Sequence, residues 1–165
     1  MKKALIIWSF LFGALILAVL VFGYFASLPT APNSHSGRIV LRANDRAVVA
    51  RGAEIYVENC ASCHGADLKG EPNWQTENPD GSWPAPPHDA SGHTWHHADE
   101  LLFTITKYGT AEALDIQEYV SNMPKFGKTL GDEEIIAVLS WIKAQWPDEI
   151  RQQHDALNEQ VRRAR

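Results

Sequence analysis

Cysteine is scarce in this chain of 165 residues: the only two, Cys60 and Cys63, lie in the short motif Cys-Ala-Ser-Cys-His. A structural zinc site normally takes four ligands, often from two separated cysteine pairs. The chain has no second pair, so zinc would need distant histidines. A thioredoxin-like disulfide belongs at a helix start within a βαβ pattern, and the sequence shows no strand pattern. The missing second cysteine pair therefore weakens the zinc interpretation, and the missing strand pattern weakens the thioredoxin interpretation.

Basic residues are also scarce in the middle of the chain. Residues 52–150 contain 5 Lys and Arg against 17 Asp and Glu, a net charge of −12, whereas residues 27–51 carry +3 and residues 151–165 carry +2. Proteins that bind nucleic acid need a basic face. The charge pattern therefore excludes nucleic acid as the expected partner.

Charged residues are absent from residues 4–26, a run of 23 residues. A helix of this length reaches roughly 34 Å, enough to cross a bilayer with some tilt. The run exceeds the apolar region of about 7 to 15 residues that is usual in a signal peptide. It also lacks a small-x-small cleavage site, because Phe25 stands between Tyr24 and Ala26. We predict an uncleaved transmembrane anchor at residues 1–26.

The remaining chain is expected to contain a linker at 27–45, one domain at 46–147 and a polar tail at 148–165. Helical patterns occupy residues 48–59, 99–108, 111–121 and 132–146, and Pro147 ends the last of them. Residues 65–92 show no period and several Pro, Gly, Asn and Asp, which indicates an irregular loop. The fold class is thus all-α, with three to five helices after the transmembrane helix. For the tail we expect a frayed surface helix ending in disorder, with a docked helix as the alternative.

The motif at residues 60–64 is the attachment signature of c-type haem. Its two thiols add to the two vinyl groups on one porphyrin edge, and the adjacent imidazole reaches the iron. We therefore predict one covalent haem c, with Cys60 and Cys63 as its thioether ligands and His64 as an axial ligand of the iron.

Further residues resemble those of a known family. Gly52 and Tyr56 stand eight and four residues before Cys60, and Val138 and Trp141 lie on the last predicted helix of the domain. This arrangement resembles the class I c-type cytochromes, specifically the membrane-anchored bacterial monohaem kind, over about residues 46–147. In that family the first and last helices pack against each other at these positions.

The resemblance implies a second axial ligand and a partner for the histidine. Met123, the sole internal methionine, precedes Pro124 and resembles the ligand in the family's Met-Pro loop. The carbonyl of Pro86 is the best match for the acceptor of the His64 ring N–H, although Pro84 or Pro87 fits in another register. The family often has leucine just after this proline pair, where this chain has His88.

Other aromatic and histidine residues have two interpretations each. Trp83, Trp95 and Tyr108 either cover the haem or hydrogen-bond a propionate, or they are ordinary core residues. Four histidines fall within ten residues: His88, His93, His96 and His97. They form a second metal site for copper or zinc, or a surface group that responds to pH, or one of them replaces Met123 on the iron.

Together these patterns predict an electron carrier rather than an enzyme. The resemblance places the haem domain on the periplasmic side of a bacterial inner membrane, where it exchanges single electrons with redox proteins. Lys125 and Lys128 flank the Met123 loop and form either a positive docking rim or solvated surface charge. The alternatives are a dedicated cytochrome subunit of an oxidase or dehydrogenase, a haem sensor or peroxidase with a labile sixth ligand, and a metal-handling protein.

Overall fold

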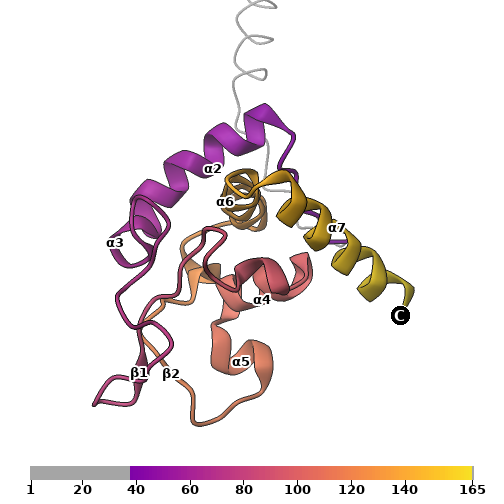
Figure 1. The fold of residues 1–165 in the computed structure, drawn as a ribbon. Helices are drawn as coiled ribbons and strands as arrows, with labels where there is room; N and C mark the ends of the chain where they lie inside the picture. The colour runs from indigo at the N-terminus through magenta and orange to yellow at the C-terminus, as the bar shows by residue number, and fades with distance from the viewer. Residues whose placement is uncertain (1–37, 165) are drawn as a thin grey trace, which may run out of the picture. The chain divides into compact units, whose positions relative to one another are not determined.

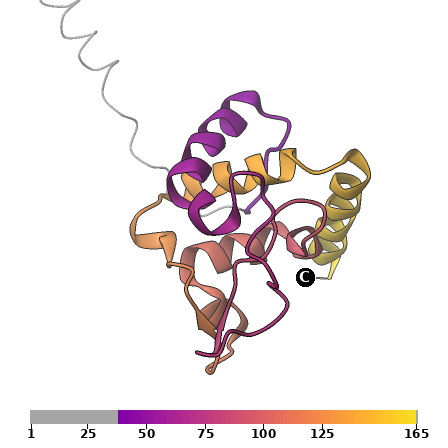
Figure 2. The same ribbon diagram turned by 60° about the vertical axis from the view of Figure 1, so that its left-hand side comes forward.

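A computed structural model describes residues 38–164, and these residues are mostly helical (Figures 1 and 2). The α-helices are α2 (Arg46–Asn59), α3 (Ala61–His64), α4 (Asp99–Tyr108), α5 (Thr110–Leu114), α6 (Asp132–Ala144) and α7 (Asp148–Arg163). Two 3₁₀ helices, η1 (Thr94–His96) and η2 (Phe126–Lys128), and two strands, β1 (Ser82–Trp83) and β2 (Val120–Ser121), complete the list. The described residues contain one α-helix more than the upper end of the expected range, because the sequence pattern did not predict α3, a turn of four residues.

The predicted transmembrane anchor at residues 1–26 lies outside the described residues. Among residues 38–164, no helix has the length and apolar character needed to cross a membrane.

Helices α2 and α6 cross in the middle of the domain (Figure 2). Gly52 allows the crossing because a Cβ at this position would lie 2.1 Å from the carbonyl oxygen of Ala137 on α6. One turn further along α2, the buried Tyr56 ring packs 4.5 Å from the Trp141 ring. The resemblance implied this crossing with Gly52, Tyr56, Val138 and Trp141; the contacts involve Gly52, Tyr56 and Trp141 as expected, with Ala137, the neighbour of Val138, closest to Gly52.

Helix α6 supplies a larger share of the apolar core than any other element described. Its buried apolar residues are Ile135, Ile136, Ala137, Val138, Leu139 and Ile142. The helix begins after Gly131, whose N–H donates to the Glu134 carboxylate at 3.1 Å. Three acidic residues in its first turn complement the positive end of the helix dipole. The helix ends at Ala144, two residues before the predicted end, and Pro147 then precedes α7.

A short pair of parallel strands corrects the expectation of a domain without strands. In the register of this pair, Ser82 lies opposite Val120 and Trp83 opposite Ser121. The predicted helix at 111–121 accordingly ends early, at Leu114. Asp115 adopts the left-handed conformation with φ of 54°, and the chain then turns into β2. Two residues per strand carry no readable alternation, so the sequence pattern did not reveal them.

The described end of the predicted linker packs on the domain. Leu41 is buried, and its N–H donates to the Asp99 carboxylate at 3.0 Å. The N–H of Arg42 donates to Ser140 Oγ on α6 at 2.8 Å. The guanidinium of Arg42 also pairs with Glu133. Residues 38–45 therefore belong to the folded unit, and the boundary predicted at residue 46 is corrected to include them.

The expectation of a frayed C-terminal tail is corrected as well, because residues 148–163 form the docked helix α7. This helix packs beside η1. His154 is fully buried, and Asn158 on the next turn is also buried. The side of α7 that faces the domain carries the predicted stripe of Ile150, His154, Leu157 and Val161. His154 and Asn158 add hydrogen bonds to the domain. The buried polar partners explain why a helix of low hydropathy docks.

A buried network around Asp99 joins three segments of the chain. The Asp99 carboxylate accepts hydrogen bonds from the N–H of Leu41 and from Asn158 Nδ2, both at 3.0 Å. In return, Asn158 Oδ1 accepts the N–H of Asp99 at 2.8 Å. Next to this pair, His154 Nε2 donates to the carbonyl of His97 at 2.9 Å. The start of α4 is thereby tied both to the segment before α2 and to α7.

This network makes the stability of the domain depend on pH through His154. Burial and the charge of Lys143 lower the pKa of His154, against the opposing effects of Asp99, the His97 carbonyl and Asp155. A second ring proton would also face Asn158 Nδ2, which lies 3.3 Å from Nδ1. The unfolded chain therefore binds this proton more readily than the folded one, and stability is lost as pH falls below 6.5, the ordinary value.

Below pH 6.5, we expect His154 to lower the free energy of unfolding by up to about 1.4 kcal/mol for each unit by which the pH falls. The measurement is urea unfolding of the protein between neutral and mildly acidic pH, compared with His154→Gln. Glutamine keeps a donor for the His97 carbonyl but does not titrate. The variant should be less stable at neutral pH and should show a shallower slope. Equal slopes in the two proteins would contradict the role given to His154.

Candidate haem site

The end of α2 and the start of α3 position the Cys-Ala-Ser-Cys-His motif. Cys60 follows the last residue of α2, and its N–H donates to the Tyr56 carbonyl at 2.9 Å. The N–H of His64 then donates to the Cys60 carbonyl at 3.0 Å. Gly65, with φ of 78°, ends the short helix, and its carbonyl accepts the Tyr56 hydroxyl at 2.8 Å. The motif is therefore a rigid turn fixed to the buried Tyr56.

The two thiols differ in exposure. Both cysteines are free, Cys60 partly buried and Cys63 exposed. Burial, with a smaller contribution from Cys63, raises the pKa of the Cys60 thiol to about 11. Such a thiol stays protonated at neutral pH, so it is a poor spontaneous nucleophile or metal ligand. This property argues against a redox-active dithiol at this position.

His64 is buried and oriented by the proline-rich loop. Its Nδ1 lies 2.8 Å from the carbonyl oxygen of Pro86, the proline that the resemblance selected. A carbonyl only accepts, so the ring proton is on Nδ1 and the lone pair on Nε2. Burial lowers the pKa of His64, while the Pro86 hydrogen bond and the charge of Glu71 act in the opposite direction.

The donor set of this site fits a haem iron. Among residues 38–164, no side chain or backbone group hydrogen-bonds to Nε2 of His64, so this lone pair is available. A metal-binding histidine normally donates its other N–H to an oxygen acceptor. His64 has both properties, and the two thiols precede it in the attachment spacing.

The strand pair β1–β2 determines where the loop with Met123 begins. It lies two residues after β2, and its N–H donates to Ser121 Oγ at 3.1 Å. Pro86 lies three residues after β1. Because the strands are parallel, the chain leaves both in the same direction. The Met123 loop and the Pro86 loop therefore start from the same end of the pair. The Met123 side chain is partly buried.

The loop after Met123 is anchored to the end of α4. Phe126 is buried, and a Cβ at Gly127 would lie 2.8 Å from Lys107 Cγ. Lys125 pairs with Glu112 at 2.9 Å. This ion pair offsets the charge of Lys125, one of the two lysines proposed to form a positive rim.

The four histidines after the proline loop point to different partners. His88 lies against His64, with ring centroids 3.9 Å apart, and its pKa is well below the usual value because of burial and the nearby charges of His64 and His93. His93 stacks on Trp74, and His96 stacks on Trp95. The His97 ring meets the His93 ring edge-on, with centroids 5.3 Å apart. No group of three or more His, Cys, Asp or Glu within residues 38–164 can hold a metal ion. The second-metal interpretation therefore has no support in the described region.

The three aromatic candidates are less buried than core residues. Trp83 is 37% exposed and Tyr108 42% exposed. Trp95 is partly buried, and its Nε1 donates to the Ala90 carbonyl at 3.4 Å. Trp146, by contrast, makes a firm long-range hydrogen bond, in which its Nε1 donates to the His88 carbonyl at 2.7 Å. Trp146 thus fixes the loop beside His64 from the end of α6.

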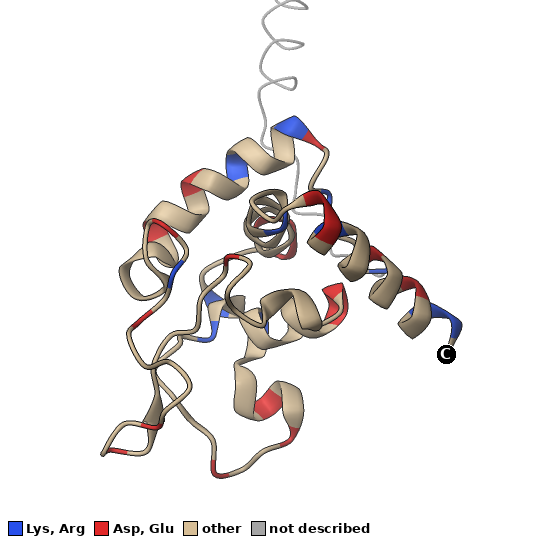
Figure 3. Ribbon diagram, in the orientation of Figure 1, with Lys and Arg blue, Asp and Glu red and all other residues tan. Residues whose placement is uncertain are grey.

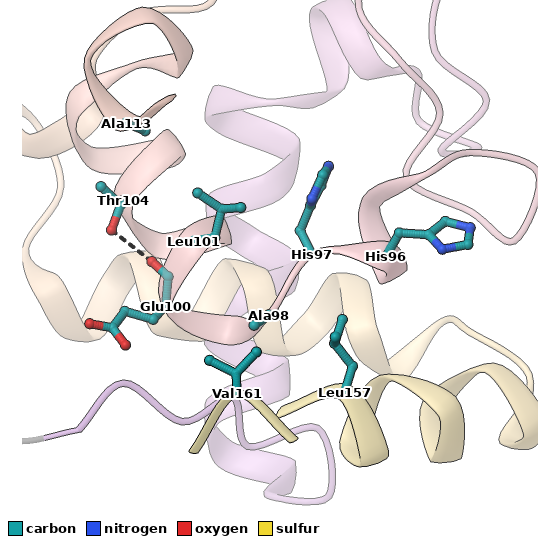
Figure 4. Close-up of a pocket in the computed structure, with 9 residues that line it drawn as sticks. All are labelled: His96, His97, Ala98, Glu100, Leu101, Thr104, Ala113, Leu157 and Val161. Carbon is teal, nitrogen blue, oxygen red and sulfur yellow. Dashed lines mark hydrogen bonds between the residues drawn. The ribbon is translucent and has the colours of Figure 1, made fainter. Parts of the chain in front are cut away.

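A separate depression of about 400 Å³ lies where α4, α5 and α7 meet (Figure 4). Its walls are largely apolar, with Leu101, Ala113, Leu157 and Val161 around it and two histidines at one side. None of Cys60, Cys63, His64 and Met123 lines it. This depression is therefore not the candidate haem site.

Three loop residues near the site were not identified from the sequence. The Leu68 carbonyl accepts the N–H of His88 at 2.7 Å and so holds the segment that follows Pro86. Gly70 and Glu71 contact the proline loop directly. Gly70 offered a signal, because a glycine in a loop often marks a close backbone approach. Leu68 acts through its backbone, and Glu71 resembles any exposed acid, so neither had a recognisable pattern.

The fold and this site define a small helical domain built around a haem-attachment motif. Residues 47–142 match the family model of cytochrome c oxidase, cbb3-type, subunit III, so the chain belongs to this family and contains a c-type cytochrome domain. Such a domain implies a covalently bound haem c. No curated protein and no solved structure matches the chain.

Proposed function

We propose that this protein is a membrane-tethered monohaem class I cytochrome c that carries single electrons between redox proteins on the periplasmic side of a bacterial inner membrane. The observation that carries the proposal is the orientation of His64. Its Nδ1 is held by the Pro86 carbonyl at 2.8 Å, and Nε2 is left for a metal. A bound haem c supplies the chemistry, which is the uptake and release of one electron.

The residues of this chain have distinct tasks in the proposal. Cys60 and Cys63 would bind the group covalently, and His64 and Met123 would hold its iron. A thioether favours reduced iron and raises the potential compared with two histidines. An iron held by both residues would have no place for a substrate, so we propose that the protein is not an enzyme. The packed α2–α6 pair keeps His64 fixed, which limits the rearrangement that accompanies each transfer.

The charge and the N-terminal sequence support the proposed location and partners. The apolar run at residues 4–26 would be the tether, and covalent haem attachment in the resembled family occurs outside the cytoplasm. The net charge of −12 over residues 52–150 favours docking with redox proteins that present a positive surface. Figure 3 shows acidic residues on helices α2, α4, α5, α6 and α7 and in the loops, with basic residues scattered between them.

Covalent attachment is tested by the double variant Cys60→Ser/Cys63→Ser. In a host that matures c-type cytochromes, the wild-type chain should retain haem on a denaturing gel, and the double variant should lose the haem stain completely. Ser62→Ala, an exposed change between the two cysteines, is the matched control and should stain as strongly as wild type. A wild-type chain that loses its haem on denaturation would rule out the proposal.

The second candidate is a dedicated cytochrome subunit of a terminal oxidase, which the name of the matching family favours. Purification of the full chain in mild detergent distinguishes the two roles. A free carrier should elute alone, whereas a subunit should co-purify with oxidase partners in fixed ratio. The haem sensor or peroxidase alternative requires an open iron site, so it predicts carbon monoxide binding to the reduced protein at neutral pH.

A further inference from the structure

The loop that follows His64 folds back and forms hydrogen bonds with the proline-rich segment. First, the N–H of Gly70 donates to the His64 carbonyl at 2.8 Å. Glu71 then makes two hydrogen bonds to one residue, Ala85. Its N–H donates to the Ala85 carbonyl at 2.8 Å, and its Oε2 accepts the Ala85 N–H at 2.6 Å. Both backbone groups of Ala85 are thus held by Glu71.

Ala85 is the only residue from Pro84 to Pro87 with a backbone N–H, because the other three are prolines. Any backbone donor that fixes this segment must therefore be that of Ala85. The next peptide carries the Pro86 carbonyl, which accepts the His64 ring N–H at 2.8 Å. A carboxylate that fixes Ala85 therefore restricts where the Pro86 carbonyl points.

Gly70 confirms how closely the two loops approach. With φ of +67°, it occupies the conformation that favours glycine, and a Cβ here would lie 2.5 Å from the Ala85 carbonyl oxygen and 2.6 Å from the Pro86 carbonyl carbon. The two segments are in direct backbone contact. The Glu71 carboxylate closes this contact from the exposed side.

We propose that Glu71 is the positioning residue of the His64–Pro86 hydrogen bond and, through that bond, tunes the reduction potential of the haem. This inference rests on the proposed function. It concerns a residue outside the Cys-x-x-Cys-His motif whose two hydrogen bonds within residues 38–164 both go to Ala85, and neither goes to a haem-binding thiol or a proposed iron ligand.

The direction of the effect follows from the basicity of His64. A firm hydrogen bond from Nδ1 makes Nε2 a stronger donor to a metal and favours the oxidised state. A loosened Pro86 carbonyl weakens that bond and favours the reduced state. The potential should therefore rise when Glu71 no longer fixes Ala85. Loss of a negative charge near the site acts in the same direction, so the two effects must be separated.

Two variants separate them. Glu71→Gln keeps an oxygen that can accept the Ala85 N–H but removes the charge, whereas Glu71→Ala removes both. Glu77→Ala is the matched control, because Glu77 is an exposed acid in the same loop and its carboxylate forms no hydrogen bond within residues 38–164. The midpoint potential of each haem-loaded protein is measured by spectroelectrochemical titration, and exchange of the Ala85 amide proton is followed by NMR.

We expect Glu71→Ala to shift the oxidised-to-reduced ratio about threefold or more toward the reduced form, where tenfold corresponds to 59 mV for one electron. Its Ala85 amide should exchange faster than that of wild type. Glu71→Gln should shift the ratio less and leave the amide protected, and Glu77→Ala should match wild type within error.

Two results would overturn the inference: a Glu71→Ala potential no different from that of Glu77→Ala, or equal shifts in Glu71→Gln and Glu71→Ala with unchanged amide exchange. The haem stain and the absorption spectrum are recorded on the same samples. Absence of attached haem in wild type would refute the proposed function, whereas attached haem with an unresponsive potential would refute only the role of Glu71.

Discussion

Replacing Gly52 with valine is expected to prevent stable folding of the cytochrome domain. The Cβ of any residue here would lie 2.1 Å from the Ala137 carbonyl oxygen and 2.8 Å from Trp141 Cβ. The first of these neighbours is helix backbone, which cannot turn aside as a flexible side chain can. Helices α2 and α6 would have to move apart, and the packing of the Tyr56 and Trp141 rings would be lost with them.

Whether Gly52→Val stabilises or destabilises the domain depends on how the steric cost compares with the gain in helix propensity. Replacing a helical glycine by a better helix former is worth at most about 1 kcal/mol in a helix interior. Overpacking a close contact typically costs about 1 to 3 kcal/mol, and a backbone clash that separates two core helices exceeds that range. The free energy of unfolding of a small domain is only about 5 to 15 kcal/mol. The steric cost therefore outweighs the gain in helix propensity.

The measurement is thermal and urea unfolding of the haem-loaded protein, together with the yield of attached haem. Ala50→Val is the matched control, because Ala50 is exposed on the same helix and the change introduces the same side chain. Ala50→Val should unfold close to wild type. If Gly52→Val unfolded within a few degrees of the control, the close α2–α6 crossing would be incorrect.

Replacing Met123 with alanine should abolish the weak long-wavelength absorption band that methionine–iron ligation gives in oxidised c-type cytochromes. Loss of the thioether removes a ligand that favours reduced iron, so the midpoint potential should fall, on the order of 0.1 V or more. The reduced variant should also bind carbon monoxide, which wild type should not. Optical titration of the haem-loaded protein measures all three changes.

Two further variants sharpen this test. Met123→His should restore a six-coordinate iron that excludes carbon monoxide while the potential stays low. Asn122→Ala, an exposed change beside Met123, should retain the band and the wild-type potential. An unchanged band in Met123→Ala would assign the sixth position to another residue, with the histidines after the proline loop as the next candidates.

The parts of the fold predicted from the sequence are those with local or periodic signals. The helix at 99–108 has the predicted bounds, with acids in its first turn and a glycine after its end. The resemblance to class I c-type cytochromes implied the crossing of α2 and α6 at Gly52 and Tyr56, and it implied Pro86, with Pro84 and Pro87 as alternatives, as the acceptor for His64. Of these positions, Gly52 has a clear physical requirement, because a side chain there would clash with the α6 backbone.

The parts not predicted depend on polar contacts between distant segments. Glu71 binds Ala85 14 residues later, and Asp99 binds Asn158 59 residues later. Neither acid differs in the sequence from a solvated surface residue, because the partner determines its role. The docked helix α7 was missed as the first choice for the same reason. Its buried face carries histidine and asparagine where a periodicity argument looks for leucine.

The crossing of α2 by α6 has a consequence for the order of events during synthesis. Gly52 meets Ala137, a residue that leaves the ribosome 85 positions later, and α6 is the main packing partner of α2 among the described elements. Contacts this distant in sequence form late. Until α6 has been synthesised, the segment with Cys60 and Cys63 lacks the helix against which α2 packs. We therefore expect that haem attachment to the two thiols does not require the finished α2–α6 crossing, in keeping with Cys63 remaining exposed even in the folded domain.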